Sequence, residues 1–256
     1  MSDVHSAARE GFSTSAEAYV RGRPEYPAEV VGWLTRDLGL EPGRTVVDLG
    51  AGTGKFTKLL ARTGATVLAV EPVEAMREQL GQALPAVHTI AGTAQAMPLP
   101  DGVADVVVCA QAFHWFATAD ALAEIHRVLT PGGQLGLVWN VRDESVEWVA
   151  ALTALITPYE GDAPRFYKGD WRQPFDGRLF GDLQQTAFAY EHVGSAEEVI
   201  VDRFLSVSFI AALPADEKAH VAAQLRELVA SYPALQGETV AFPYRTQVYR
   251  ATRRER

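Results

Sequence analysis

Short apolar segments alternate with amphipathic ones through the first half of this chain. Each apolar segment is rich in β-prone residues and precedes a run whose hydrophobic positions recur at helical spacing. Strands are predicted at Thr45–Leu49, Thr66–Val70, Val87–Ala91, Asp105–Ala110 and Gln134–Trp139. Helices are predicted between them at Gly54–Arg62, Val73–Ala83 and Ala119–Leu129. Strands that alternate with helices indicate an α/β fold, with a parallel sheet covered on both faces.

The pattern is less regular in the second half. A loop rich in proline, glycine and aromatic residues is expected over Thr157–Phe180, after a helix at Glu144–Ile156. A strand is predicted at Leu183–His192, and a final strand or hairpin at Thr239–Thr252. Helical segments are predicted at Ser195–Phe209 and Ala215–Ser231.

The first predicted strand runs directly into a glycine-rich turn. The turn, Gly50–Gly54, has glycine at every second position, and glycine lets a ligand approach closely because it has no Cβ. A dinucleotide-binding turn would need glycine at Lys55, and a P-loop would need serine or threonine at Phe56. A different nucleotide site at the end of this strand is therefore predicted, with a ligand-free tight turn as the alternative.

An acidic residue ends the second predicted strand. Glu71, followed by Pro72, lies about 20 residues beyond the glycine turn, where a carboxylate can accept hydrogen bonds from ribose hydroxyls. The alternative is a surface carboxylate that caps the next helix. The spacing favours ribose binding.

Residues 46–54 have the pattern apolar-apolar-Asp-x-Gly-x-Gly-x-Gly, which resembles the first motif of class I S-adenosylmethionine-dependent methyltransferases. The runs A-F-H-W-F (112–116), R-G-R-P-x-Y-P (21–27) and P-Y-R-T (243–246) resemble the trans-aconitate-type branch, a group that methylates small molecules. The resemblance implies a Rossmann-like doubly wound sheet of seven strands with the last strand antiparallel. It also implies S-adenosylmethionine as the methyl donor.

The resemblance assigns residues to the donor. Asp48 would lie beneath the glycine turn near the donor's amino group, and the segment after the third strand would lie beside adenine, although Thr93 and Gln95 replace the usual acidic residues. Backbone groups after the fourth strand would hold the methionine moiety, and the leading segment would cover the donor. The predicted donor-binding residues are Asp48, Gly50, Ala51, Gly52, Thr53, Gly54, Glu71, Pro72, Thr93, Ala94, Gln95, Ala110, Gln111, Tyr19 and Arg23.

The acceptor is expected to bind where the fourth strand ends, because an open α/β sheet places its site there. Phe113, Trp115 and Phe116 are predicted to line this pocket, and aromatic faces can stabilise a sulfonium. His114 is predicted to line the pocket or, alternatively, to act as a general base. Candidates for holding an acidic substrate are Arg142, Arg165 and Arg172.

A single methyltransferase domain, 1–256, is expected. Its predicted parts are an N-terminal lid and first helix (1–40), a donor-binding core (41–141), a substrate-covering insert of helix and loop after the fifth strand (142–182), and C-terminal strands and helices (183–256). The alternatives to an enzyme of this class are a non-catalytic S-adenosylmethionine-binding or regulatory protein and an NAD-dependent oxidoreductase. The missing third glycine disfavours the oxidoreductase.

The composition of the chain limits the classes of partner and ligand that we expect. The net charge of −9 argues against nucleic acid, since phosphate binding needs a basic surface. The one cysteine, Cys109, excludes an internal disulfide, and the six histidines lack metal-ligand spacing, so no metal is expected. With no long apolar run and no signal-like N-terminus, no membrane association and a cytoplasmic location are expected. The identity of the acceptor and the oligomeric state are left open.

Overall fold

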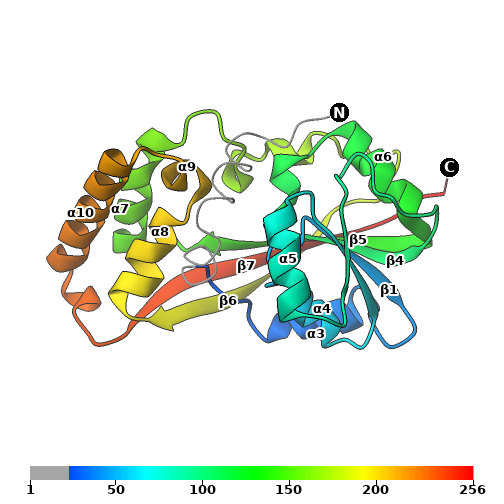
Figure 1. The fold of residues 1–256 in the computed structure, drawn as a ribbon, viewed down its shortest axis with the longest axis horizontal. Coiled ribbons are helices and arrows are strands. Elements are labelled where there is room, and N and C mark those ends of the chain that lie inside the picture. The colour runs from blue at the N-terminus through cyan, green and yellow to red at the C-terminus, as the bar shows by residue number, and fades with distance from the viewer. Residues whose placement is uncertain (1–22, 256) are drawn as a thin grey trace.

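A seven-stranded sheet runs through the computed structural model, which describes residues 23–255 (Figure 1). The strand order is β3-β2-β1-β4-β5-β7-β6, and β7 is antiparallel to both of its neighbours. The strands are β1 (Thr45–Leu49), β2 (Thr66–Val70), β3 (His88–Ile90), β4 (Ala104–Ala110), β5 (Leu129–Arg142), β6 (Gln184–Gly194) and β7 (Val240–Thr252). The predicted doubly wound, Rossmann-like sheet with an antiparallel last strand is therefore confirmed. The order reverses between β1 and β4, which is where such sheets bind ligands.

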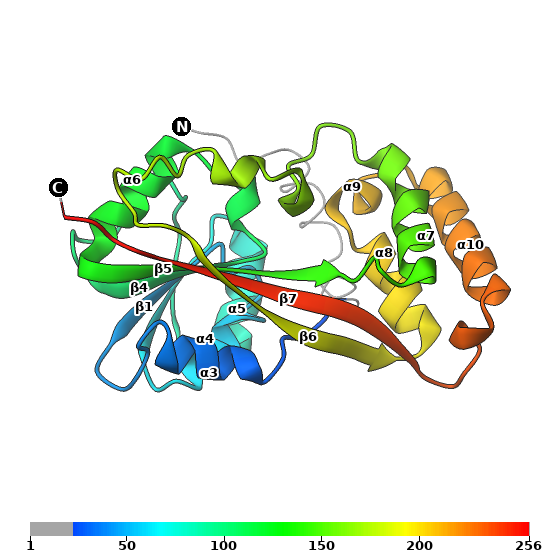
Figure 2. The ribbon, with the colours of Figure 1, turned by 180° about the vertical axis from the view of Figure 1, so that it is seen from behind.

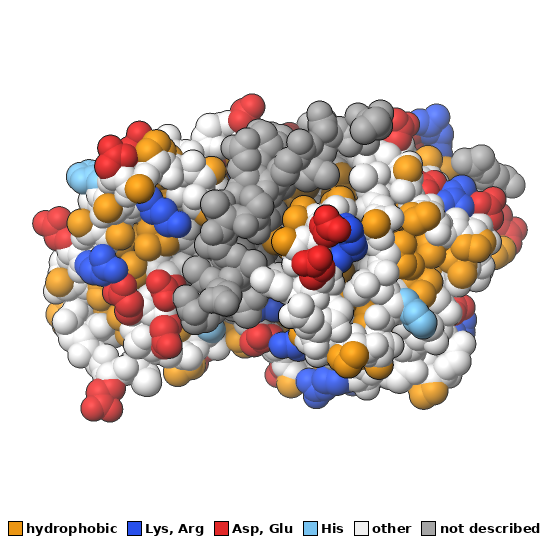
Figure 3. All heavy atoms as spheres, viewed as in Figure 1, with side chains coloured by type: hydrophobic (Ala, Val, Ile, Leu, Met, Phe, Trp, Pro, Cys, Tyr) orange, Lys and Arg blue, Asp and Glu red, His pale blue; other side chains and the backbone are white. Residues whose placement is uncertain are grey.

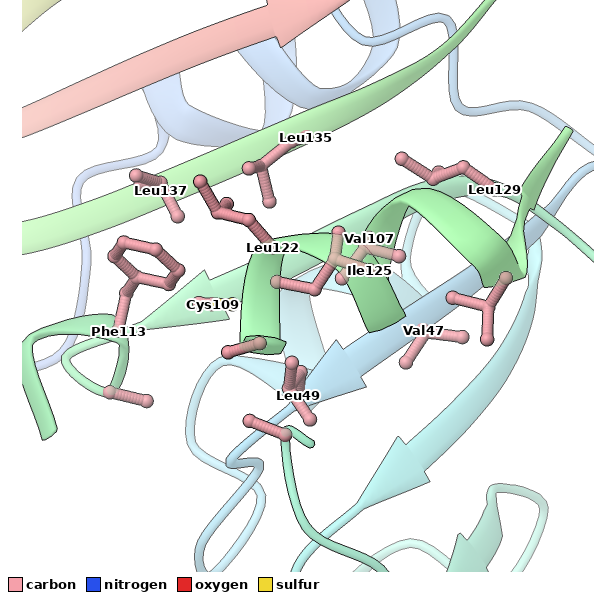
Figure 4. Close-up of a cluster of buried hydrophobic side chains, with 14 of the residues drawn as sticks. Val47, Leu49, Val107, Cys109, Phe113, Leu122, Ile125, Leu129, Leu135 and Leu137 are labelled. Atoms are coloured by element: carbon pink, nitrogen blue, oxygen red, sulfur yellow. The ribbon is translucent and has the colours of Figure 1, made fainter. Parts of the chain in front are cut away.

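Helices cover both faces of the parallel part of the sheet. Alternate residues of β4 point to opposite faces, so Val107 and Cys109 pack under α6 (Ala119–Val128), as Figure 4 shows. Val106 and Val108 belong to the opposite core, with α3 (Glu29–Arg36) and α4 (Thr57–Ala61). On that side, α5 (Glu74–Ala83) buries its Leu80 against β2. Burial on both faces explains why these strands are almost continuously apolar.

A helical lobe lies at the far end of the long strands β6 and β7 (Figures 1 and 2). It consists of α7 (Glu147–Ile156), α8 (Arg203–Leu205), α9 (Ser208–Ala211), α10 (Ala215–Ser231) and a π-helix at Glu197–Asp202. The lobe has its own core, which includes Leu152, Phe204 and Leu225. The lobe therefore adds a separate core to those on the two faces of the parallel strands.

Four segments differ from the sequence prediction. The helix after the glycine turn begins only at Thr57, because the chain is still turning at 54–56. Strand β5 starts at Leu129 rather than Gln134, and its register against β4 shifts between Ala104 and Val106. Short 3₁₀ turns interrupt the predicted loop 157–180, and the predicted helix 195–209 divides into the π-helix, α8 and α9. The last segment, predicted as a strand or a hairpin, is one strand.

Further observations concern the helices, the surface and the cysteine of residues 23–255. In that range, no helix is both long and apolar enough to cross a membrane, and no group of acidic, histidine and cysteine side chains could hold a metal ion. On the face drawn in Figure 3, the described acidic and basic side chains are mixed rather than gathered by sign. Cys109 is fully buried.

Candidate active site

The glycine turn that follows β1 has three residues in the left-handed region of φ. Gly50, Gly52 and Gly54 have φ of 75°, 57° and 89°. A Cβ on Gly50 would lie 2.7 Å from the Cβ of Ala112, and one on Gly54 would lie 3.0 Å from the Cγ of Leu80. Among the described residues that are not its chain neighbours, the atom nearest to a Cβ on Gly52 would be the Sδ of Met76, at 3.9 Å. The fold therefore requires glycine at the two outer positions, while the space beside Gly52 is open to a ligand.

Glu71 is fixed beside this turn by backbone amides. Its Oε2 accepts a hydrogen bond from the Gly52 N–H and its Oε1 accepts one from the Val73 N–H, both at 2.9 Å. The side chain is buried, and burial raises the pKa of the carboxyl although the two amide hydrogen bonds oppose the shift. Each carboxylate oxygen retains acceptor capacity, which suits a ligand with two neighbouring hydroxyls.

Asp48, in β1 beneath the turn, is a buried carboxylate with one satisfied oxygen. Its Oδ2 accepts a hydrogen bond from the Thr57 hydroxyl at 2.6 Å, and its Oδ1 has no partner among the described residues. Burial raises the pKa of Asp48 to about 7. An unpaired buried carboxylate oxygen is destabilising. Asp48 therefore marks a place where a cationic ligand group would be stabilised.

A cavity of about 180 Å³ joins these features at the carboxyl ends of β1 and β4. Gly54 does not line it, because its role is the turn itself, and Tyr19 lies outside the described residues. The sequence-predicted residues that do line this cavity are Asp48, Gly50, Ala51, Gly52, Thr53, Glu71, Pro72, Thr93, Ala94, Gln95, Ala110, Gln111, Trp115, Phe116 and Arg23.

The loop after β3 is held in place by a charged network. Arg127 of α6 donates to the carbonyls of Met97 and Leu99, and it pairs with Glu124 at 2.7 Å. The Glu124 carboxylate also accepts from the Met97 N–H at 2.7 Å. This network positions the segment that carries Ala94 on the wall of the cavity without relying on regular secondary structure.

A second cavity, of about 110 Å³, adjoins the first. The two share Gln111, Trp115, Arg23 and Arg203 in their walls. His114 lines the second cavity, and its Nδ1 accepts a hydrogen bond from the Trp139 indole at 3.1 Å. Burial lowers the pKa of His114 to about 3, so the ring is neutral and carries its proton on Nε2. His114 is thus a hydrogen-bond donor to the cavity and a poor general base.

Two of the residues predicted for the acceptor site line neither cavity. Phe113 lines neither cavity, because it is fully buried in the core that Figure 4 draws, against Phe116 and Phe175. Arg172 lies over the Trp171 ring, 4.1 Å from its centroid, and also lines neither cavity. Arg142 and Arg165 do line the second cavity.

Arg203 is the main wall residue that the sequence did not single out. It follows the π-helix directly, and π-helical turns are frequent at functional sites. No spacing signal in the sequence distinguishes it from a surface arginine. Only the fold brings it to the two cavities.

The strand order and the glycine turn define a class I methyltransferase fold, and comparison with known proteins agrees. A family model described as a methyltransferase domain matches residues 47–137. An uncharacterized methyltransferase-like protein of Schizosaccharomyces pombe is 38% identical over 240 residues, which cover 93% of each chain. An uncharacterized methyltransferase of Mycobacterium bovis is 38% identical over 242 residues, 94% of this chain and 95% of the relative. The chain therefore belongs to the methyltransferase family, whose methyl donor is S-adenosylmethionine.

Solved structures share the fold. A candidate type II methyltransferase from Anaeromyxobacter dehalogenans aligns with a TM-score of 0.60 at 25% identity, over 90% of this chain and 96% of the other. The YcgJ protein from Bacillus subtilis aligns with a TM-score of 0.58 at 19% identity, over 90% of this chain and all of the other. Neither likeness distinguishes the trans-aconitate-type branch, which stays a prediction.

Proposed function

We propose that this chain catalyses methyl transfer from S-adenosylmethionine to a small molecule, with the donor in the first cavity and the acceptor in the second. The observation that carries the proposal is the open space at Gly52 next to the fixed Glu71 carboxylate. Within this proposal, Glu71 holds the ribose hydroxyls and the loop around Ala94 holds adenine. Asp48, whose Oδ1 has no partner among the described residues, would hold the donor's ammonium group.

When bound, the donor supplies an electrophilic methyl group on a sulfonium. The protein's own contribution is to position the acceptor behind that methyl group and to exclude water, which together can supply several kcal/mol. The aromatic walls Trp115 and Phe116 lie beside the first cavity and can stabilise the positive charge before transfer. Since His114 is neutral and donates from Nε2, we assign it to orienting the acceptor.

The size of the second cavity supports a small acceptor. A volume of about 110 Å³ has room for a compact metabolite. We also propose that residues 142–182 form part of the acceptor side, because Arg142, Arg165 and Phe166 line this cavity.

The test of the donor site is a calorimetric titration of S-adenosylmethionine and S-adenosylhomocysteine into the wild type, Glu71→Gln and Glu74→Gln. Glu74 is exposed in the first turn of α5 and serves as the matched control. The amide in Glu71→Gln cannot accept at both positions, so its affinity is expected to fall about tenfold or more. Equal affinities for Glu71→Gln and the wild type would refute the site.

A single-turnover incubation with methyl-labelled donor and a metabolite panel separates the enzyme from a non-catalytic relative of the same fold. Transfer of label to a small molecule is the expected result. Donor binding without transfer to any compound would favour the regulatory alternative.

A further inference from the structure

Strand β6 forms one edge of the sheet, far from the two cavities in the strand order. It pairs with β7 over 11 residues without a register shift, and it is the last strand of the sheet (Figures 1 and 2). Among residues 23–255, no backbone hydrogen bond joins β6 to any segment other than β7. A long strand with unpaired outer amides and carbonyls is a template for a further strand.

The strand also lacks the features that usually block pairing at a sheet edge. Edges are commonly protected by lysine, proline, a bulge or a short strand. β6 contains no lysine and no proline, and its register against β7 shows no bulge. Burial lowers the pKa of His192, so Glu191 is the one side chain of the strand that is charged at neutral pH. The backbone of this edge is therefore open to pairing.

One face of β6 is exposed along its whole length. Alternate residues of a strand point to the same face, and on the opposite face Phe188 and Tyr190 are partly buried against the cores. Val193, on the exposed face, has 60% of its surface accessible. The exposed residues of this face are Gln185, Ala187, Ala189, Glu191 and Val193. Apart from its one carboxylate, the face is small, apolar or neutral.

The neighbouring strand adds the opposite charge to this face. Arg245 of β7 lies opposite Ala189 in the ladder and is exposed, while Glu191 lies opposite Pro243. Neither Glu191 nor Arg245 forms an ion pair with a described residue. The face therefore presents one free carboxylate on its outer strand and one free guanidinium on the strand behind it.

We propose that two copies of this chain associate by antiparallel pairing of their β6 strands about a two-fold axis at Tyr190, which joins their sheets into one. Such an interface uses the same surface of both copies. In this register, Val193 faces Ala187 of the second copy, so the exposed apolar side chain is covered. Pairing over this length supplies about eight to ten backbone hydrogen bonds, a number typical of a protein interface.

Charge complementarity selects this position of the axis. With the axis at Tyr190, Glu191 faces Ala189 of the second copy, and Arg245 of that copy lies directly behind, about 10 Å away across two strand spacings. The short alanine side chain leaves room for the carboxylate and the guanidinium to meet, and symmetry forms the pair twice. An axis at Glu191 would set two carboxylates face to face, which is destabilising. An axis at Ala189 would take Glu191 out of line with Arg245.

The association is tested by sedimentation velocity of the full chain over a wide range of concentration. The variants are Glu191→Arg, Arg245→Glu and the double exchange, and the matched control is Glu227→Arg, which changes an exposed residue of α10. We expect a reversible dimer in the wild type and the control. Each single exchange should weaken it about tenfold or more, because it sets like charges together, and the double exchange should restore it.

Two outcomes of that experiment would overturn the proposal. One is a wild type that stays monomeric at every concentration. The other is a dimer whose affinity is unchanged in both single variants, or is lost in them and not restored by the double exchange. Because Glu191 and Arg245 are exposed, all variants should fold, and circular dichroism verifies this.

Cysteine cross-linking tests the register. Ala187→Cys and Val193→Cys are prepared separately, and the native Cys109 is fully buried. Residues opposite one another in antiparallel strands have Cβ atoms about 4.5–5.5 Å apart, close enough for a disulfide after small adjustment. Oxidation of the mixed variants should give a cross-linked dimer, and oxidation of either variant alone should not. A cross-link in either variant alone, or none in the mixture, would overturn the register.

Association and methyl transfer are separate properties of the chain. Titration with S-adenosylhomocysteine reports on the donor site, whereas sedimentation reports on β6. A monomeric protein that binds S-adenosylhomocysteine would overturn this inference and leave the proposed function standing. A dimer that does not bind it would have the opposite meaning.

Discussion

Gly50 and Gly52 are two residues apart in one turn, yet their replacement by alanine is expected to have different consequences. Both have positive φ, so alanine at either position costs about 1–2 kcal/mol in backbone strain. At Gly50 the new Cβ would also lie 2.7 Å from Ala112 Cβ, and such overpacking adds about 1–3 kcal/mol. At Gly52 the nearest atom of the described, non-adjacent residues, Met76 Sδ at 3.9 Å, is at ordinary contact distance.

The free energy of unfolding, measured by urea denaturation, should therefore fall by about 2–5 kcal/mol for Gly50→Ala and by about 1–2 kcal/mol for Gly52→Ala. In calorimetric titration with S-adenosylhomocysteine, the affinity of Gly52→Ala should be affected even though its stability changes less. Gly52→Ala is expected to bind about tenfold or more weakly even though it stays folded, because its methyl group occupies ligand space. Wild-type affinity in Gly52→Ala would refute the placement of the donor.

Three further predictions concern charge and order. The pKa of Asp48 is raised to about 7 in the folded state, so its contribution to the free energy of unfolding is lost as pH rises from about 4 to 7. In urea denaturation at different pH values, Asp48→Asn should remove this loss, which is at most about 4 kcal/mol. An unchanged dependence of the free energy of unfolding on pH would count against the buried carboxylate. Histidine-selective NMR should show no titration of His114 between about pH 5 and 8, since its pKa is about 3, and a midpoint in that range would contradict its burial. Arg127→Ala should speed amide exchange across 93–103, with a local loss of about 1–3 kcal/mol, and unchanged protection would show that the network is dispensable.

The parallel strands were the most predictable part of the fold. β1 and β2 begin and end where the sequence predicts, because strands buried on both faces are almost continuously apolar and a glycine or acidic residue ends each run. The helical lobe was less predictable: the periodicity of 195–209 is helical, but packing against β6 and β7 divides it into a π-helix and two short helices. Tertiary contacts, rather than local preference, set those boundaries.

The candidate site also has one part that the sequence predicts well and one part that it does not. The donor side follows from motifs whose residues are close in sequence, so the cavity contains most of the residues predicted for it. The acceptor side depends on distant segments. A 3₁₀ turn at Phe113–Trp115 directs Phe113 into the core and Trp115 to both cavities, and no local pattern predicts which side chain faces inward. The hydrogen bond from Trp139 to His114, and the presence of Arg203, both require the folded chain.

The placement of the donor can be checked in a crystal structure of the protein with S-adenosylhomocysteine. We expect the ribose hydroxyls within hydrogen-bonding distance of the Glu71 carboxylate, the ligand in contact with Gly52, and its sulfur facing the cavity lined by Arg142 and Arg203. A ligand bound elsewhere, or bound in the same cavity with its sulfur turned away from that second cavity, would contradict it.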